Sequence, residues 1–262
     1  MGRAREWVVG VLGVGVLACG GVEPFVECSQ APVVRFADDE GGAASGDERG
    51  IVAGVVRYRG PLPEVSPWME EPLAEPWCET FREDGRLKDE RVLVDDAGGL
   101  ANAFVFLSSD PPTSSQATDT DVEFVFERCA LQPRALGMRN GQTLVVTSAD
   151  EEQILHNAHP RPRKNRDTSG PWSPTGPRRF KLRRAEAPFP VSCDVHAWER
   201  AYVGVFSHPW FAVTDEHGRF TFPEPLPPGT HALKIWHEHL GEQLADVTIT
   251  EHTQQTSLEL TY

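Results

Sequence analysis

Two histidines and one cysteine have the residue types and the spacing of metal ligands. Cys193 and His196 are three residues apart in one short run, and His156 precedes the cysteine by 37 residues. One thiolate and two imidazoles form the equatorial donor set that holds copper in electron-transfer sites. The thiolate is a soft donor and imidazole a borderline one, so the set suits copper better than magnesium or calcium. The Cys-x-x-His spacing lets both side chains of a tight loop converge on one ion.

The sequence around these residues resembles the plastocyanin-like segment of cupredoxins. The similarity is greatest to bacterial exported proteins that join such a segment to carboxypeptidase-regulatory-like β sequence, and it covers most of the chain from about residue 50 onward. The matching runs are Gly141-Gln142-Thr143-Leu144, Ala149-Asp150, Leu155-His156-Asn157-Ala158-His159 and Cys193-Asp194-Val195-His196-Ala197-Trp198.

The resemblance implies that His156, Cys193 and His196 hold one copper ion. It also implies that Asn157 hydrogen-bonds to the loop that carries the cysteine and so orients the ligands. The family usually has methionine, the weak axial ligand, three residues after the second histidine, where this chain has Glu199. Glu199 either approaches the metal or points to solvent. Zinc is an alternative occupant, because two histidines, a cysteine and a carboxylate also form a tetrahedral zinc set.

A further histidine, His159, follows His156 by three residues. On an extended strand its side chain therefore points to the opposite face. We place His159 around the site and outside the ligand set, although a local bend could bring it closer.

The N-terminus has the features of an export signal. Arg3 and Arg5 form a charged start, and residues 7–17 are apolar but too few to span a bilayer. The run Val16-Leu17-Ala18-Cys19 resembles a bacterial lipobox, in which Cys19 becomes the lipidated first residue. Ordinary signal cleavage beside an incidental cysteine is the alternative. We expect an exported cell-envelope protein, either a periplasmic or an outer-membrane lipoprotein, that meets the membrane only through its lipid anchor.

The chain has five cysteines, Cys19, Cys28, Cys78, Cys129 and Cys193. Export leads to an oxidising compartment, where disulfides persist. If Cys19 carries lipid and Cys193 carries metal, three cysteines remain. We favour a disulfide between Cys78 and Cys129 because both lie in the presumed folded body, but the sequence alone does not determine the connectivity.

The 262 residues carry a formal net charge of −14, which disfavours nucleic acid and anionic lipid surfaces as partners. Nine arginines and lysines nonetheless fall within residues 161–184. One interpretation is a solvated loop that offsets the acidic remainder. The other is a docking patch for an acidic redox partner, placed beside the metal loop.

The apolar pattern indicates an all-β protein. Alternation predicts strands at Ile51–Tyr58 and Leu100–Leu107, and no helical periodicity of useful length competes. Near the C-terminus, turn residues between residues 211–214 and 219–222 predict a hairpin. Further strands are expected at Val122–Phe126, Thr143–Ser148, Gln153–Asn157, Phe180–Arg183, Phe189–Cys193 and Tyr202–Phe206.

We expect four parts along the chain. Residues 1–19 are the signal peptide with its lipobox, and residues 20–49 form a flexible linker, of which residues 37–49 contain no large apolar residue. The run from Thr214 to Leu233 resembles the second half of a carboxypeptidase-regulatory-like domain. The resemblance implies a split β-sandwich of that kind, residues 50–118 with 208–262, and a Greek-key cupredoxin-like β-sandwich, residues 119–207, between its halves. A single extended sandwich is the alternative.

These features favour a cell-envelope copper-binding protein that transfers electrons or handles copper. We do not expect an enzyme, because the sequence has no Ser/His/Asp triad order, phosphate loop or His-Glu-x-x-His run. The competing hypothesis is a surface binding or adhesion module, for carbohydrate or protein, that keeps the cupredoxin-like fold without functional copper. Glu199 favours that hypothesis, whereas the intact His156, Cys193 and His196 set disfavours it.

Overall fold

The computed structural model of the protein describes residues 49–73, 75–108, 120–150, 154–166, 176–250 and 255–262. Regular structure in these residues is almost entirely β, so the all-β prediction is confirmed. The predicted signal peptide, Cys19, Cys28 and nearly all of the predicted linker lie outside the described residues. In the described part of the chain, no helix has the length and apolar character needed to cross a membrane.

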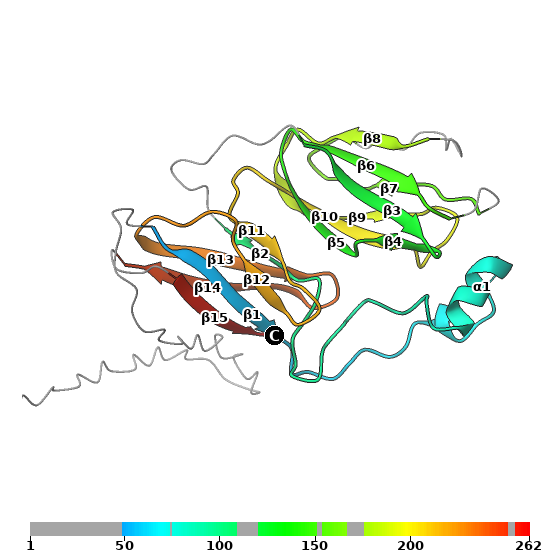
Figure 1. The fold of residues 1–262 in the computed structure, drawn as a ribbon, viewed down its shortest axis with the longest axis horizontal. Helices are drawn as coiled ribbons and strands as arrows, with labels where there is room; N and C mark the ends of the chain where they lie inside the picture. The colour runs from blue at the N-terminus through cyan, green and yellow to red at the C-terminus, as the bar shows by residue number, and fades with distance from the viewer. Residues whose placement is uncertain (1–48, 74, 109–119, 151–153, 167–175, 251–254) are drawn as a thin grey trace, which may run out of the picture. The chain divides into compact units, whose positions relative to one another are not determined.

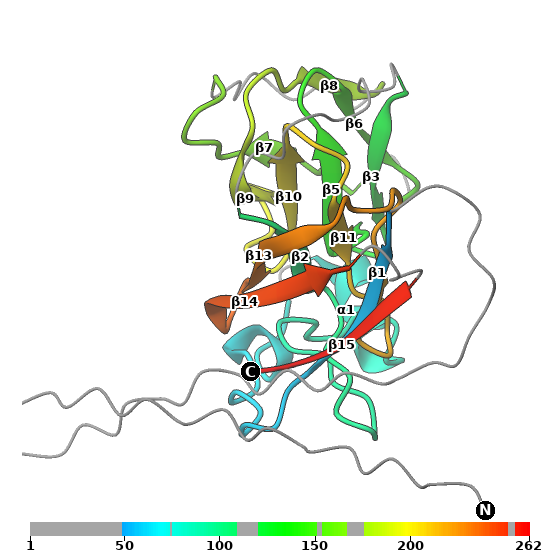
Figure 2. The ribbon, with the colours of Figure 1, turned by 90° about the vertical axis from the view of Figure 1, so that its left-hand side faces the viewer.

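Two sheets are built from the early and late parts of the described chain (Figure 1). One has the order β12-β1-β15, and the other has the order β11-β2-β13-β14. Strand β1 runs parallel to β15, next to it in Figure 2, and antiparallel to β12. The strands are β1 (Ile51–Arg57), β2 (Phe104–Leu107), β11 (Phe211–Val213), β12 (Arg219–Thr221), β13 (Gly229–His237), β14 (Gly241–Ile249) and β15 (Gln255–Thr261).

Alternation in the sequence explains how β1 and β2 are buried. In β1, Val52 and Val56 enter a core that the two sheets share, while Ile51 stays exposed. Strand β2 is buried on both faces. Its residues Val105 and Leu107 join that shared core, and its phenylalanines pack in a different cluster. Successive side chains of a strand point to opposite faces, so one short strand serves two cores.

A second pair of sheets comes from the middle of the chain. Their strand orders are β4-β3-β6-β8 and β5-β10-β9-β7. The pairs β3 with β6 and β5 with β10 are parallel, so both sheets are mixed. A core that includes Phe124, Leu144, Phe189 and Val203 draws on both sheets. The strands are β3 (Val122–Glu127), β4 (Ala130–Gln132), β5 (Ala135–Arg139), β6 (Thr143–Ser148), β7 (His159–Pro160), β8 (Arg178–Lys181), β9 (Glu186–Ser192) and β10 (Arg200–Phe206).

A small apolar cluster connects the two pairs of sheets. Phe104 and Phe106 of β2 pack with Ala135 of β5 and Phe206 of β10. Beside this cluster, Arg134 forms an ion pair with Glu238 across an N–O distance of 2.6 Å. The two larger cores use different stretches of sequence, but the predicted domain boundaries themselves stay a prediction.

Four local features differ from the predictions. No periodicity in the sequence predicted a helix, yet α1 (Pro76–Glu83) forms, with proline in its first turn and Cys78 buried, and a short 3-10 helix, η1 (Pro67–Met69), precedes it. The predicted hairpin of residues 211–214 with 219–222 is not a strand pair, because β11 pairs with β2 and β12 pairs with β1. The predicted strand from Leu100 is shortened to β2 because Asn102 adopts a left-handed φ of 62°. Residues 154–157, predicted as strand, have no strand pairing, and the amide of Asn157 donates to the Cys193 sulfur instead.

Candidate metal centre

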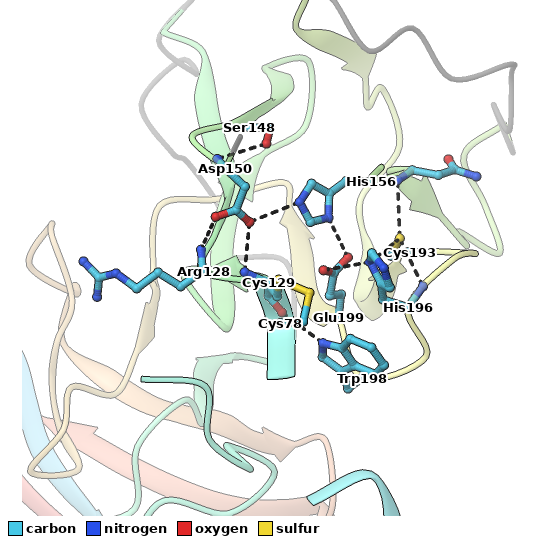
Figure 3. Close-up of polar contacts among 11 residues, drawn as sticks. Cys78, Arg128, Cys129, Ser148, Asp150, His156, Cys193, His196, Trp198 and Glu199 are labelled. Atoms are coloured by element: carbon cyan, nitrogen blue, oxygen red, sulfur yellow. Dashed lines mark hydrogen bonds and ion pairs between the residues drawn. A yellow bond between two sulfur atoms is a disulfide. The ribbon is translucent and has the colours of Figure 1, made fainter. Parts of the chain in front are cut away.

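Four buried side chains converge between the sheets of the middle segment (Figure 3). His156 lies in the irregular segment before β7, and Cys193 directly follows β9. His196 and Glu199 lie in the turn that leads into β10. The donor atoms of these four residues all lie within 4.8 Å of one another. The fold therefore brings residues that are 43 positions apart into one potential ligand set.

Glu199 lies between the two histidines. Its Oε2 atom is 2.9 Å from Nδ1 of His156, and its Oε1 atom is 3.0 Å from Nδ1 of His196. The Cys193 sulfur is 4.0 Å from the same Nδ1 of His196. Glu199 is 1% exposed, so it faces the centre of the cluster and not solvent. The centre thus presents two imidazole Nδ1 atoms, one sulfur and one carboxylate.

Backbone amides of Asn157 and His196 each donate to the Cys193 sulfur at 3.4 Å. The Asn157 side chain also donates to Asp194, the residue after the cysteine, at 2.7 Å. Asn157 therefore connects the segment of the first histidine to the cysteine loop. His159 lies outside the four donors, with its Nδ1 atom 2.9 Å from the Asp194 carboxylate.

Asp150 is the contact that sequence reasoning did not identify. Its Oδ2 atom is 3.1 Å from Nε2 of His156, on the side of the ring away from Glu199. The same carboxylate accepts hydrogen bonds from the backbone amides of Arg128 and Cys129 (Figure 3). A carboxylate on the remote nitrogen of a ligating histidine fixes the tautomer and raises the basicity of the ligand. A carboxylate six residues before a candidate histidine is the only sequence signal, and it is weak.

The turn that holds Asp150 is strained. Arg128 and Cys129 join β3 to β4 with φ values of 55° and 57°, a region that residues other than glycine seldom adopt. A two-residue hairpin turn of this hand is usually built from Asn-Gly or a similar pair. Here the bonds to Asp150 and the disulfide between Cys78 and Cys129 hold it in place. The disulfide joins the pair expected from the sequence and connects α1 to this turn.

Aromatic rings cover both histidines. Phe126 stacks on His156 with ring centroids 4.4 Å apart and planes 7° from parallel. Trp198 stacks on His196 at 5.0 Å, and Trp68 stacks on Trp198 at 6.0 Å. The indole nitrogen of Trp198 donates to the Cys129 carbonyl at 3.0 Å, which fixes the ring. The stacked rings of His196, Trp198 and Trp68 thus run from the centre of the site to Trp68, which is half-buried.

The four residues of the cluster shift one another's pKa values. Burial alone would lower the pKa of His156, but Asp150, Cys193 and Glu199 outweigh it and raise the pKa to about 11. The pKa of His196 is raised to about 9, against burial, by Cys193 and Glu199. Burial would raise the pKa values of Cys193 and Glu199, but interactions with the neighbouring histidines lower both. Without metal, these shifts favour the ionised forms of the thiol and the carboxyl groups and the protonated forms of the two imidazoles.

The donor chemistry fits a copper or zinc ion. Thiolate, imidazole and carboxylate are ligands of both metals. Although Glu199 Oε1 is buried and lies beside His196, it receives no hydrogen bond of good geometry from the described residues. A bound ion would satisfy this oxygen. All four predicted metal ligands lie in the cluster. The predicted lipidation site, Cys19, lies outside the described residues.

The basic segment, residues 161–184, begins beside this centre and continues along β9. Arg161 pairs with Asp194 beside the cysteine loop, at 2.9 Å. The following residues run along β9 toward Glu186, whose carboxylate accepts from the amides of Lys164 and Asn165. Glu186 begins β9, and Cys193 follows its seven residues, so the two ends lie about 23 Å apart at the rise of a strand. The structure thus places Arg161 beside the cysteine loop and Lys164 near the far end of β9, and a docking role for the segment stays a prediction.

Comparisons with known proteins give weak similarity. No family model and no curated protein matches the chain. The copper-containing nitrite reductase of Thermus scotoductus SA-01 is similar at 14% identity and a TM-score of 0.30, over 38% of this chain and 25% of that one. A Cu(I) amicyanin variant is similar at 14% identity and a TM-score of 0.25, and a reduced variant at 13% and 0.26; each covers 39% of this chain and 98% of its own. The chain spans only a quarter of the reductase's length, and likenesses this weak leave the function to be argued from the site itself.

Proposed function

We propose that this protein is a cupredoxin-like copper-binding protein of the cell envelope that transfers single electrons. The observation that carries the proposal is the buried convergence of His156, Cys193, His196 and Glu199, all of whose donor atoms lie within 4.8 Å. A copper ion held by these residues would supply one-electron chemistry. The residues themselves set its coordination, exclude water and conduct the electron to the surface.

The charge of the cluster supports a divalent or monovalent cation there. When Asp150, Cys193 and Glu199 are ionised they bring three negative charges, and protons on His156 and His196 return two positive ones. A divalent ion that displaces these two protons leaves the same net charge of minus one. Buried charges are costly unless they are paired, so a cation is a natural replacement for the two protons.

Burial favours electron transfer over catalysis on a substrate. The side chains of His156 and Glu199 are fully buried, and that of His196 is 7% exposed. A substrate therefore cannot reach the donors without displacing the rings that cover them. An electron needs no such opening, and the stack of His196, Trp198 and Trp68 gives it a continuous aromatic route outward. We accordingly propose no enzymatic activity.

Copper is favoured over zinc by the combination of a soft thiolate, two imidazoles and an aromatic shell. A zinc site of the same four ligands is the alternative, and a metal-free binding module is the third candidate. The carboxylate of Glu199, 3.0 Å from Nδ1 of His196, is the observation that favours these two alternatives.

One experiment separates these three functions. Purified protein is loaded with Cu(II) or Zn(II), its metal content is measured, and its visible absorption spectrum is recorded. Copper ligation by Cys193 gives an intense thiolate-to-copper charge-transfer band that Cys193→Ser removes. Tight zinc binding with no such band would favour the zinc site, and no stoichiometric binding of either metal would favour the binding module.

We also propose that the mature protein is tethered to a membrane through a lipidated Cys19. The charged start, short apolar stretch and lipobox-like run support this. A lipidated cysteine with two or three acyl chains anchors stably, whereas one chain holds only marginally. The Cys19→Ser protein should appear in the soluble fraction or stay unprocessed. The tether is wrong if fractionation does not change and no lipid label is incorporated.

A further inference from the structure

A cationic groove lies along the edge strand β8, away from the metal centre. β8 is the last strand of its sheet, at the upper margin of the ribbon in Figure 1. The groove encloses about 580 Å³, and none of the described residues that line it has a carboxylate. Its volume falls within the range of sites that hold small ligands. The cations that line it are Lys164, Arg166, Arg179, Lys181, Arg183 and Arg184.

The two walls of the groove are fixed to each other by a polar network. The buried Glu186 carboxylate accepts hydrogen bonds from the backbone amides of Arg163, Lys164 and Asn165. The Asn165 side-chain oxygen accepts from the amides of Arg183 and Arg184 on the opposite wall. The Asn165 side-chain nitrogen donates to Glu186 and to the carbonyl of Arg184. The hydrogen bonds of Asn165 and Glu186 form a frame that holds the two walls, and hence their cations, in place.

This network does not neutralise the groove. Both carboxylate oxygens of Glu186 accept hydrogen bonds from backbone amides and from the Asn165 side chain, so Glu186 is not an ion-pair partner of the lysine and arginine side chains. Arg179 is paired with Asp121. Among the described residues, no carboxylate pairs with the side chains of Lys164, Arg166, Lys181 or Arg183. Clefts lined by one sign of charge focus the field and concentrate counter-ions, so the groove attracts anions although the whole chain is acidic.

We propose that this groove binds a compact, phosphate-rich anion. Arginine and lysine are the usual donors to phosphate oxygens, and arginine adds bidentate geometry. The cube root of the groove volume is roughly 8 Å. An extended acidic peptide presents same-face carboxylates about 6.6 Å apart, so only one or two would face six cations. Linked phosphates supply more charge in the same space.

The groove acts independently of the metal centre. Asn165 and Glu186 lie at the start of β9, and Cys193 lies beyond its other end. An anion in the groove is therefore too distant to ligate the metal. Phosphate groups reach such a site either on a soluble molecule or on a lipid headgroup, and the two sources give different experimental results.

Binding is measured by titration calorimetry of the purified protein with sodium tripolyphosphate, and by co-sedimentation with vesicles that contain phosphatidic acid in phosphatidylcholine. We expect Lys181→Ala and Arg183→Ala each to weaken binding about tenfold, the effect of losing one charge-assisted hydrogen bond. Arg59→Ala removes an exposed cation just after β1; it is the matched control and leaves binding unchanged. Asn165→Ala keeps every charge but removes the frame, so it should also weaken binding.

Tripolyphosphate binding that depends on Lys181 and Arg183 supports the proposal and identifies a soluble source. Binding only to phosphatidic acid vesicles, with the same dependence, supports it and identifies a headgroup. The proposal is overturned by absence of binding to both probes. It is also overturned if polyglutamate binds as tightly as tripolyphosphate, or if the Arg59 variant weakens binding as much as the groove variants. Circular dichroism of each variant checks that it is folded.

Discussion

The Nε2 atom of His156 lies 3.1 Å from the carboxylate of Asp150, and this contact decides which ring nitrogen faces the metal centre. With Nε2 engaged, Nδ1 is left to point at Glu199, 2.9 Å away. Asp150 is in turn held by two backbone amides of a left-handed turn. The ligand is therefore oriented by a chain of contacts that reaches the disulfide.

Asp150→Asn should weaken copper binding about 10-fold to 100-fold, the usual effect of losing a carboxylate behind a ligating histidine. The isosteric amide keeps the volume but removes the charge that makes His156 a better donor. Affinity is measured by competition with a chelator of known strength. Asp95→Asn is the matched control, because Asp95 holds His217 at 3.0 Å away from the site. Equal affinities for wild type and Asp150→Asn would remove Asp150 from the proposed centre.

Glu199→Met should raise the reduction potential of the copper-loaded protein. An anionic oxygen stabilises Cu(II) over Cu(I), and a weak thioether does not, so axial identity tunes such sites. The visible spectrum should move toward that of a trigonal blue site. Cyclic voltammetry and absorption spectra measure the two effects. Unchanged potential and spectrum would mean that Glu199 does not contact the metal, despite its position in the cluster.

Trp68→Leu should slow electron exchange without changing the reduction potential. Trp68 ends the ring stack that begins at His196, and it does not touch the donor atoms. The rate is measured with an inorganic oxidant, and the potential by voltammetry. Trp77→Leu, which removes a more exposed indole on α1, is the control and should leave the rate unchanged. Equal rates for wild type and Trp68→Leu would rule out this electron route.

Loss of the disulfide between Cys78 and Cys129 should lower the free energy of unfolding by about 4 kcal/mol on the loop-entropy relation for a separation of 51 residues. Urea unfolding of the metal-free Cys78→Ser and Cys129→Ser double variant measures this. Because the same turn holds Asp150, the variant should also bind copper more weakly. A variant with reduced stability and full copper affinity would show that the disulfide only stabilises the fold.

The metal-free protein should lose stability as the pH falls from about 6.5 to 4, with His237 as one cause. Burial, then His239 and Arg134, lower the pKa of His237 to about 4 in the folded state. The unfolded chain therefore takes up a proton first, which costs the fold roughly 3 kcal/mol across this window. The metal-site histidines have raised pKa values in the folded state, so their protonation adds stability as the pH falls and does not cause this loss.

The variant His237→Leu should flatten this pH dependence, measured by urea unfolding at neutral and acid pH. The same slope in His237→Leu and in wild type would mean that other groups cause the acid sensitivity.

Local patterns in the sequence predicted those features that depend on local physics. Alternation of apolar residues placed β1 and assigned Val105 and Phe106 to opposite faces, because a strand's period of two is written directly in its residues. The ligand types were also readable, since thiolate and imidazole chemistry belongs to the residues themselves. A helix of eight residues, α1, was missed because it is short and held by a disulfide that no periodicity reports.

Tertiary structure alone decided how these residues meet. Whether Glu199 faces solvent or the two histidines depends on the path of the turn into β10, and the structure turns it inward. Asp150 lies in the site because the backbone amides of Arg128 and Cys129, in the strained turn between β3 and β4, donate to its carboxylate. Arg161 stays beside the metal loop, whereas Lys164 lies near the other end of β9. Such relations join residues far apart in the chain, so they depend on strand pairing and packing and leave no local signal in the sequence.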